Sequence, residues 1–79
     1  MTNQLLTSIT SACAILVSRD KIYDVFIEED YVEAKVIYTK YAQIKDFEKE
    51  LRNTPFLKGV PIRVECTGRR NGCYFFRIS

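Results

Sequence analysis

The chain has 79 residues, of which 47% are hydrophobic and 13% aromatic, and this predicts one packed domain over residues 1–79 with a core only just large enough for stability. It has three cysteines and no histidine, so the commonest general base and metal ligand is missing and at least one thiol is unpaired, as in a reducing compartment. The net charge of +2 is small, but residues 1–40 carry four Lys or Arg against six Asp or Glu, and residues 41–79 carry eight against four.

The first expected element covers residues 3–18, where apolar side chains recur at helical spacing. Leu5, Ile9, Cys13 and Leu16 fall on one stripe, and Thr2 or Asn3 can cap the helix. The β-branched side chains of this segment and the apolar run over residues 12–17 would also suit a buried strand. We expect a helix, with a strand over residues 12–18 as the alternative.

Residues 22–28 and 31–39 then alternate between apolar and polar side chains and predict a hairpin. Glu29 and Asp30 would form its two-residue loop, with a longer loop as the alternative because Glu-Asp is poor chemistry for so tight a turn. A shift of one residue would expose the whole apolar set, so the pattern fixes the register. The inner side of the hairpin would pair Ile27 with Val32, Val25 with Ala34, and Tyr23 with Val36.

Residues 41–53 predict the helix around which the domain is organised. Tyr41, Ile44, Phe47 and Leu51 recur at steps of three and four and form one apolar stripe. Thr39 is the expected N-cap of this helix. A helix with a single apolar stripe has to lie on another apolar surface, which the flanking hairpins provide as a sheet.

A second hairpin is expected after residue 60, because residues 60–67 alternate and residues 68–72 form the strongest turn signal. A two-residue turn at Asn71 and Gly72 would set the inner face of one strand beside the outer face of the other, so we expect a three-residue loop over residues 70–72. Cys66 would then point inward and Cys73 outward towards solvent, and no disulfide joins them. The outer face would pair Glu65 with Arg77 and Thr67 with Phe75.

These elements predict the α+β fold class. We expect a small antiparallel sheet of two hairpins, about four strands, covered by one or two helices in the order α-β-β-α-β-β. If residues 12–18 form a strand, the order becomes β-β-β-α-β-β.

The basic C-terminal hairpin is a candidate nucleic-acid site. Guanidinium groups neutralise phosphates, and an exposed ring stacks on a base for about 1–3 kcal/mol. The simpler interpretation is an ordinary cross-strand ion pair between Arg77 and Glu65 beside a solvated turn. The candidate residues are Arg63, Arg69, Arg70, Phe75 and Arg77.

The first hairpin is the candidate site for a protein partner. Its carboxylates would present a negative patch to a basic partner, but the spacing of a calcium loop is missing, so we expect no metal. The simpler interpretation is a solvated sheet edge that resists edge-to-edge pairing. The candidate partner-binding residues are Asp24, Phe26, Glu28, Glu29, Asp30 and Glu33.

Aromatic side chains are too many to be interior in so small a domain. Phe26, Tyr31 and Ile37 fall on the outer side of the first hairpin. Exposed aromatic side chains mixed with charge are typical of a protein interface. Alternatively, the N-terminal helix covers this side and turns it into a second core.

The sequence contains no phosphate-binding glycine loop, nucleophile elbow or acid–base pair, so we expect no enzyme activity and no cofactor. Our main hypothesis is a protein-binding module, an inhibitor or adaptor that acts on a larger complex, in the style of phage or mobile-element proteins directed at a host defence or nucleic-acid-processing system. The alternative is a nucleic-acid-binding domain, and a homodimer joined through an edge strand is compatible with both. The start of the chain lacks a basic signal-peptide region and no apolar run has the roughly 20 residues that cross a bilayer, so we expect a cytoplasmic protein without membrane contact.

Overall fold

The computed structural model describes residues 1–37, 40–41 and 43–79. Its four strands form one antiparallel sheet in the order β1-β2-β4-β3. The predicted α+β class and the order α-β-β-α-β-β are confirmed, and the alternative strand over residues 12–18 is wrong because a helix covers this segment. The elements are α1 (Asn3–Ser18), β1 (Asp24–Ile27), β2 (Val32–Ile37), α2 (Ile44–Arg52), β3 (Val64–Arg70) and β4 (Cys73–Ile78).

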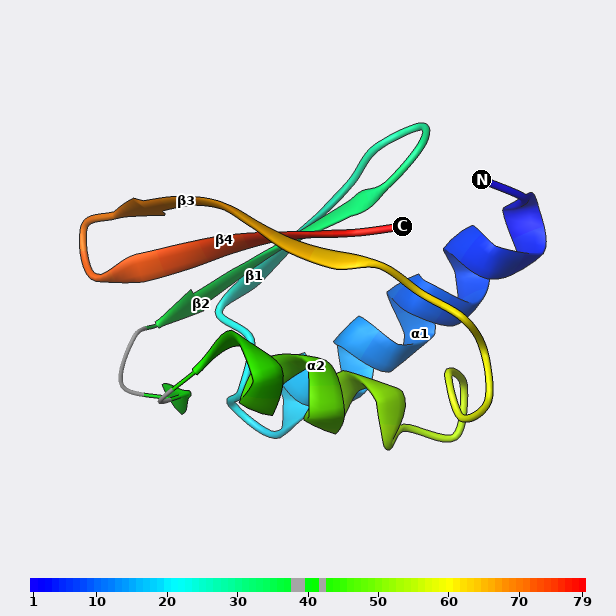
Figure 1. The fold of residues 1–79 in the computed structure, drawn as a ribbon, viewed down its shortest axis with the longest axis horizontal. Helices are drawn as coiled ribbons and strands as arrows, with labels where there is room; N and C mark the ends of the chain where they lie inside the picture. The colour runs from blue at the N-terminus through cyan, green and yellow to red at the C-terminus, as the bar shows by residue number, and fades with distance from the viewer. Residues whose placement is uncertain (38–39, 42) are drawn as a thin grey trace.

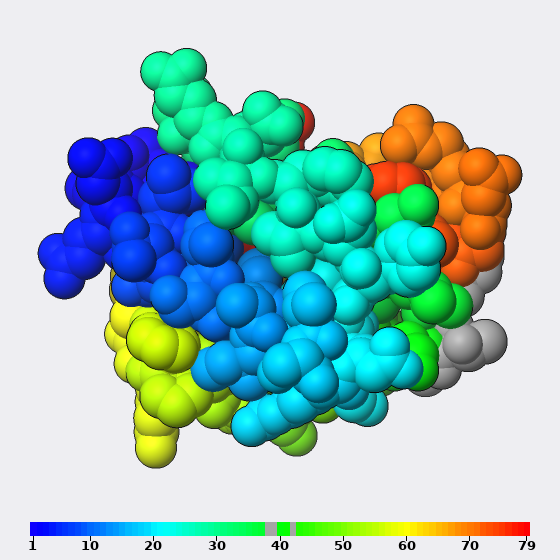
Figure 2. Space-filling view, turned by 180° about the vertical axis from the view of Figure 1, so that it is seen from behind, coloured from blue at the N-terminus to red at the C-terminus, as the bar shows by residue number. Residues whose placement is uncertain are grey.

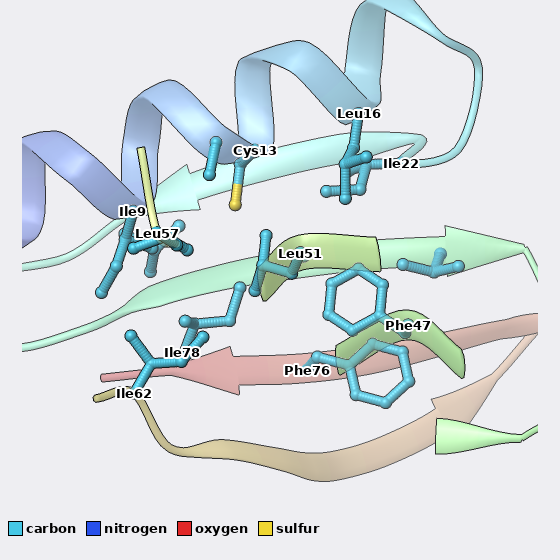
Figure 3. Packing of buried hydrophobic residues seen from close by; sticks show 14 of the residues in the cluster. Ile9, Cys13, Leu16, Ile22, Phe47, Leu51, Leu57, Ile62, Phe76 and Ile78 are labelled. Atoms are coloured by element: carbon cyan, nitrogen blue, oxygen red, sulfur yellow. The ribbon is translucent and has the colours of Figure 1, made fainter. Parts of the chain in front are cut away.

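Both helices lie against the same face of the sheet (Figure 1). The core is built from the apolar stripes of α1 and α2 and from the inward positions of β2 and β4. Phe47 of α2 stacks on Phe76 of β4 with ring centroids 4.5 Å apart, which fixes α2 over the centre of the sheet (Figure 3). Among the described residues, neither helix covers the opposite face of the sheet.

Helix α1 is stabilised by an N-terminal cap and by an apolar stripe that packs on the core. The hydroxyl of Thr2 accepts a hydrogen bond from the N–H of Leu5 at 3.1 Å, as at an N-cap. The stripe buries Ile9, Ala12, Cys13 and Leu16 against the core. The idea that this helix covers the outer side of the first hairpin is wrong, because its apolar stripe packs on the inner side, beside α2.

Helix α2 begins later than the apolar pattern predicts. Gln43 is its N-cap, and the N–H of Gln43 donates to Oδ2 of Asp46 at 3.2 Å. Tyr41 precedes the helix and packs edge-on against Phe47 at 5.4 Å. Ile44, expected in the buried stripe, is 42% exposed because it lies in the first turn and Tyr41 takes the inner place. The predicted cap Thr39 lies outside the described residues.

The first hairpin has the predicted register, with Val25 opposite Ala34 and Ile27 opposite Val32. The register of the second hairpin is confirmed near the chain end of β4 but differs from the prediction near the turn. Cys66 opposes Phe76, but Thr67 is an extra residue in β3, so that Gly68 opposes Phe75 and Arg70 opposes Cys73. Asn71 and Gly72 form a two-residue turn with φ values of +52° and +78°. A β-bulge therefore restores the parity for which we expected a three-residue loop.

The three cysteines are free thiols with different surroundings. Cys73 is only 7% exposed, so the expectation that it lies near solvent is wrong. It points to the outer face, but it lies between Ile37 of β2 and Arg70 of β3, which flank it in register. Burial raises the pKa of the Cys13 thiol to about 12, and the reactive thiolate is therefore scarce at this position near neutral pH.

We predict that alkylation distinguishes the three thiols. Half-buried Cys66 should react first with iodoacetamide at neutral pH, whereas Cys13 and Cys73 should react only when the protein opens. Peptide mass mapping after a short pulse, with and without urea, measures this order. Rapid modification of Cys13 in the native protein would contradict its place in the core.

Candidate functional site

The uncovered face of the sheet carries aromatic and charged side chains from all four strands. Phe26 opposes Glu33 across β1 and β2, and Lys35 opposes Phe75 across β2 and β4. These positions alternate with buried ones such as Phe76, so their side chains point away from the core. We call this surface the open face, and it comprises Asp24, Phe26, Glu33, Lys35, Glu65, Thr67, Arg70, Phe75 and Arg77.

Cationic side chains lie over the rings of the open face. The guanidinium carbon of Arg70 is 4.3 Å from the ring centroid of Phe75, and Nζ of Lys35 is 5.9 Å from the same centroid. Arg77 lies over the ring of Tyr31 at 4.0 Å. These distances are within the range of cation–π attraction. At exposed sites such contacts contribute about 0.5–1 kcal/mol each, which favours these positions of the long side chains.

Charges of opposite sign alternate across the same surface. Nε of Arg63 is 2.6 Å from Oε1 of Glu65, and the hydroxyl of Thr67 donates to Oε1 of Glu33 at 3.4 Å. Arg77 is in register with Glu65, as predicted. The carboxylate of Glu65 nevertheless pairs with Arg63 instead, and the open face is therefore mixed in charge.

The structure brings together most of the residues predicted to bind nucleic acid, but not all. Arg70 lies over Phe75, and Arg77 is on the same side of β4 opposite Glu65, with which Arg63, the residue before β3, pairs. The bulge turns Arg69 to the other side, where it opposes Tyr74 and lies 5.3 Å from the centroid of that ring. Arg69 therefore does not belong to the open face, contrary to the sequence-based expectation.

The predicted partner-binding residues lie together on the first hairpin. Asp24, Phe26 and Glu33 belong to the open face, and Phe26 is 40% exposed. The other three form the tip of the hairpin, which projects away from the helices in Figure 1. All three are exposed: Glu28, Glu29 and Asp30.

Lys35 is a member of this surface that was not selected from the sequence, although it lies at its centre. The alternation of residues 31–39 already placed it on the outer side beside Glu33. Lys35 could have been predicted to belong to this surface, because it is a charged residue on the outer side of a strand and Phe75 was expected to be exposed on the same side.

A hollow of about 320 Å³ lies between α1 and β1. We call it the edge groove. Figure 2 looks onto this side of the molecule, with α1 in blue beside the first hairpin in cyan and green. Periodicity did not reveal it, because each of its apolar residues fitted a helix or strand pattern. It is lined by Thr10, Ala14, Val17, Tyr23, Asp24, Val25 and Ile27.

Two side chains of the helical layer have a raised pKa. Cys13 is described above. Burial, and then the hydrogen bond that the Tyr41 hydroxyl donates to Oε2 of Glu50, raise the pKa of Tyr41. The phenol therefore stays protonated and joins the start of α2 to its own last turns. Both groups belong to the core, away from the open face.

None of the protein families, curated proteins or solved structures compared with this chain matches it. Within the part of the chain that the structure describes, no group of three or more His, Cys, Asp or Glu side chains is placed to hold a metal ion. Over the same residues, no helix has both the length and the apolar character needed to span a membrane.

Proposed function

We propose that this protein is a non-catalytic protein-binding module that acts as an inhibitor or adaptor of a larger macromolecular complex. The observation that carries this proposal is the open face. Both helices pack on one side of the sheet, and the other side presents Phe26 and Phe75 among charges of both signs. Such an uncovered, mixed surface on a rigid sheet suits recognition of another protein.

The composition of the open face matches that of protein interfaces. Aromatic residues and arginine are enriched at the energetic centres of interfaces, and Phe75 with Arg70 and Arg77 supplies both types. Alternating charges favour a partner with the complementary pattern and disfavour others. Because cation–π contacts favour these positions of the Arg and Lys side chains, binding in the same positions would cost less conformational entropy.

Nucleic-acid binding is the second candidate, and one observation favours it. Lys35 and Arg70 lie over the ring of Phe75, and Arg77 follows two residues later on the same strand, so cations for phosphates lie beside a ring for a base. The carboxylates among them would repel phosphates, and the guanidinium groups of Arg70 and Arg77 already lie over the protein's own rings. These two features support protein binding over nucleic-acid binding.

Matched phenylalanine variants test the location of this site. The Phe26→Ala/Phe75→Ala double variant removes the two rings of the open face. Phe56→Ala removes a ring that is 48% exposed in the connection after α2 and serves as the control. We expect the wild type and the control to capture the same protein from a lysate of the source organism, and the double variant to lose most of it.

Urea denaturation and circular dichroism confirm that each variant is folded before the captures are compared. Equal capture by the wild type and the folded double variant would contradict a role for the open face.

A further inference from the structure

The edge groove lies beside a strand that has one unpaired side. β1 is at the end of the order β1-β2-β4-β3. The N–H of Glu28 donates to the carbonyl of Tyr31 at 2.9 Å. Because paired and unpaired positions alternate in an antiparallel hairpin, the backbone groups of Val25 and Ile27 point to the outer edge. Oδ1 of Asp24 accepts a hydrogen bond from the N–H of Val25 at 2.8 Å. Another strand could therefore pair with this edge at Ile27 and at the carbonyl of Val25, and would have to displace the carboxylate of Asp24 to reach the N–H of Val25.

The side chains along this edge are unusually apolar for a surface. Val17 is 42% exposed, Tyr23 63% and Ile27 57%. They are three of the seven large hydrophobic side chains that are exposed among the described residues, and all three line the edge groove. An added strand would place every second side chain over α1, where it would fill the hollow and cover this apolar surface.

The charges around the groove select a basic occupant. Asp24 lines the groove, and Glu28, Glu29 and Asp30 stand at the tip of the same hairpin. On the other side, Nζ of Lys35 lies 5.0 Å from the ring centroid of Tyr23, and the carboxylate of Asp20 is paired with Lys40 at 3.0 Å. Arg19 and Lys21 flank Asp20, so five carboxylates face four cations, and the excess lies at the hairpin tip. Lys or Arg residues flanking the occupant would therefore be attracted, most strongly at the end near the tip.

A second copy of this chain fits the edge poorly. Two β1 strands paired antiparallel would bring Asp24 and the acidic tip of one copy against the same carboxylates of the other. Like charges directly opposite each other destabilise a strand pair. The acidic edge therefore disfavours self-association and favours a different protein.

We propose that the edge groove binds an extended segment of a partner protein that has apolar side chains at alternate positions and Lys or Arg at its flanks. The segment adds a strand beside β1: its backbone hydrogen bonds supply affinity, and its apolar side chains in the groove supply specificity. This inference rests on the proposed protein-binding function and names the chemistry of the partner segment.

Selection from a random peptide library tests this proposal without knowledge of the partner. The Val17→Gln/Ile27→Thr variant makes the groove polar at two exposed positions. Ile44→Gln, a polar substitution at a position on α2 that is 42% exposed, is the matched control. We expect the wild type and the control to enrich peptides with alternating apolar residues and basic flanks. The groove variant should bind these peptides about tenfold or more weakly.

Two readouts identify the mode of binding. Hydrogen exchange at the N–H of Ile27 should slow when a selected peptide binds, because a new strand accepts that hydrogen bond. A Glu28→Gln/Glu29→Gln/Asp30→Asn variant should bind the peptides more weakly and with a smaller dependence on salt.

Several outcomes would overturn the proposal: no enrichment, enriched peptides without basic residues, equal binding by the groove variant, or unchanged exchange at Ile27. A doubled mass in solution that the groove variant abolishes would assign the edge to a second copy and also overturn it. Failure of protein binding as such is a separate result. If the groove variant captures the cellular partner as well as the wild type does, only the edge-groove proposal fails. If neither captures a protein, the proposed function fails as well.

Discussion

Replacing Phe76 by alanine is expected to lower the free energy of unfolding by about 3–5 kcal/mol. Its side chain is fully buried, stacks on Phe47 at 4.5 Å and lies 5.7 Å from the ring of Tyr74. The variant leaves a cavity where α2 meets the centre of the sheet. A domain of this size has about 5–10 kcal/mol of stability in total, so much of the variant should be unfolded at moderate urea concentrations.

Phe75→Ala is the matched control, because the same side chain is removed from the neighbouring residue of the same strand. Phe75 points to the open face, where it is only partly buried. Its replacement removes this partial burial and the contacts with Arg70 and Lys35, so the free energy of unfolding should fall by about 1 kcal/mol. Urea denaturation followed by circular dichroism measures both variants. Equal losses of stability would mean that the two faces of β4 are not divided into a core and an open surface.

Leu51→Ala should lower the free energy of unfolding by about 2–5 kcal/mol, because Leu51 lies on the inner side of α2 and is fully buried in the core. Ile44→Ala in the same helix should cost less than about 1 kcal/mol, since Ile44 is 42% exposed. These two variants test the structure against the apolar pattern of the sequence. That pattern predicts that Ile44 and Leu51 are equally buried, whereas the structure buries only Leu51. The measurement is the shift of the urea midpoint at a constant slope.

A large loss for Ile44→Ala, close to that of Leu51→Ala, would contradict the start of α2 at Ile44 and restore the longer predicted helix.

The sequence predicted the sheet well because strand alternation has few solutions. Val25 with Ala34 and Glu65 with Arg77 are in the predicted register, since a shift by one residue would exchange the inner and outer sides. Helix α1 was also predictable from Thr2 and from its apolar spacing.

The tip of the second hairpin was not predictable in the same way. A three-residue loop and a two-residue turn with a bulge both preserve the parity of the strands. The bulge at Thr67 decided between them, and it moved Arg69 off the open face and brought Arg70 opposite Cys73. Only the three-dimensional course of β3 distinguishes these solutions.

The location of the candidate site depends on which side of the sheet each helix covers. Alternation placed Phe26 and Phe75 on the outer side, but α1 could have covered that side without any change in its own stripe. The edge groove was invisible for a related reason. Ile27 has an inward position in the pattern but is 57% exposed, because it lies at the end of an edge strand.

The most direct test of protein binding is capture from a lysate of the source organism on the immobilised protein, with and without nuclease and over a series of salt concentrations. Mass spectrometry quantifies the retained proteins. Protein binding predicts a stoichiometric partner that survives nuclease and depends only weakly on salt. Capture that disappears with nuclease and falls steeply with salt would contradict it and assign the function to the basic residues around Phe75.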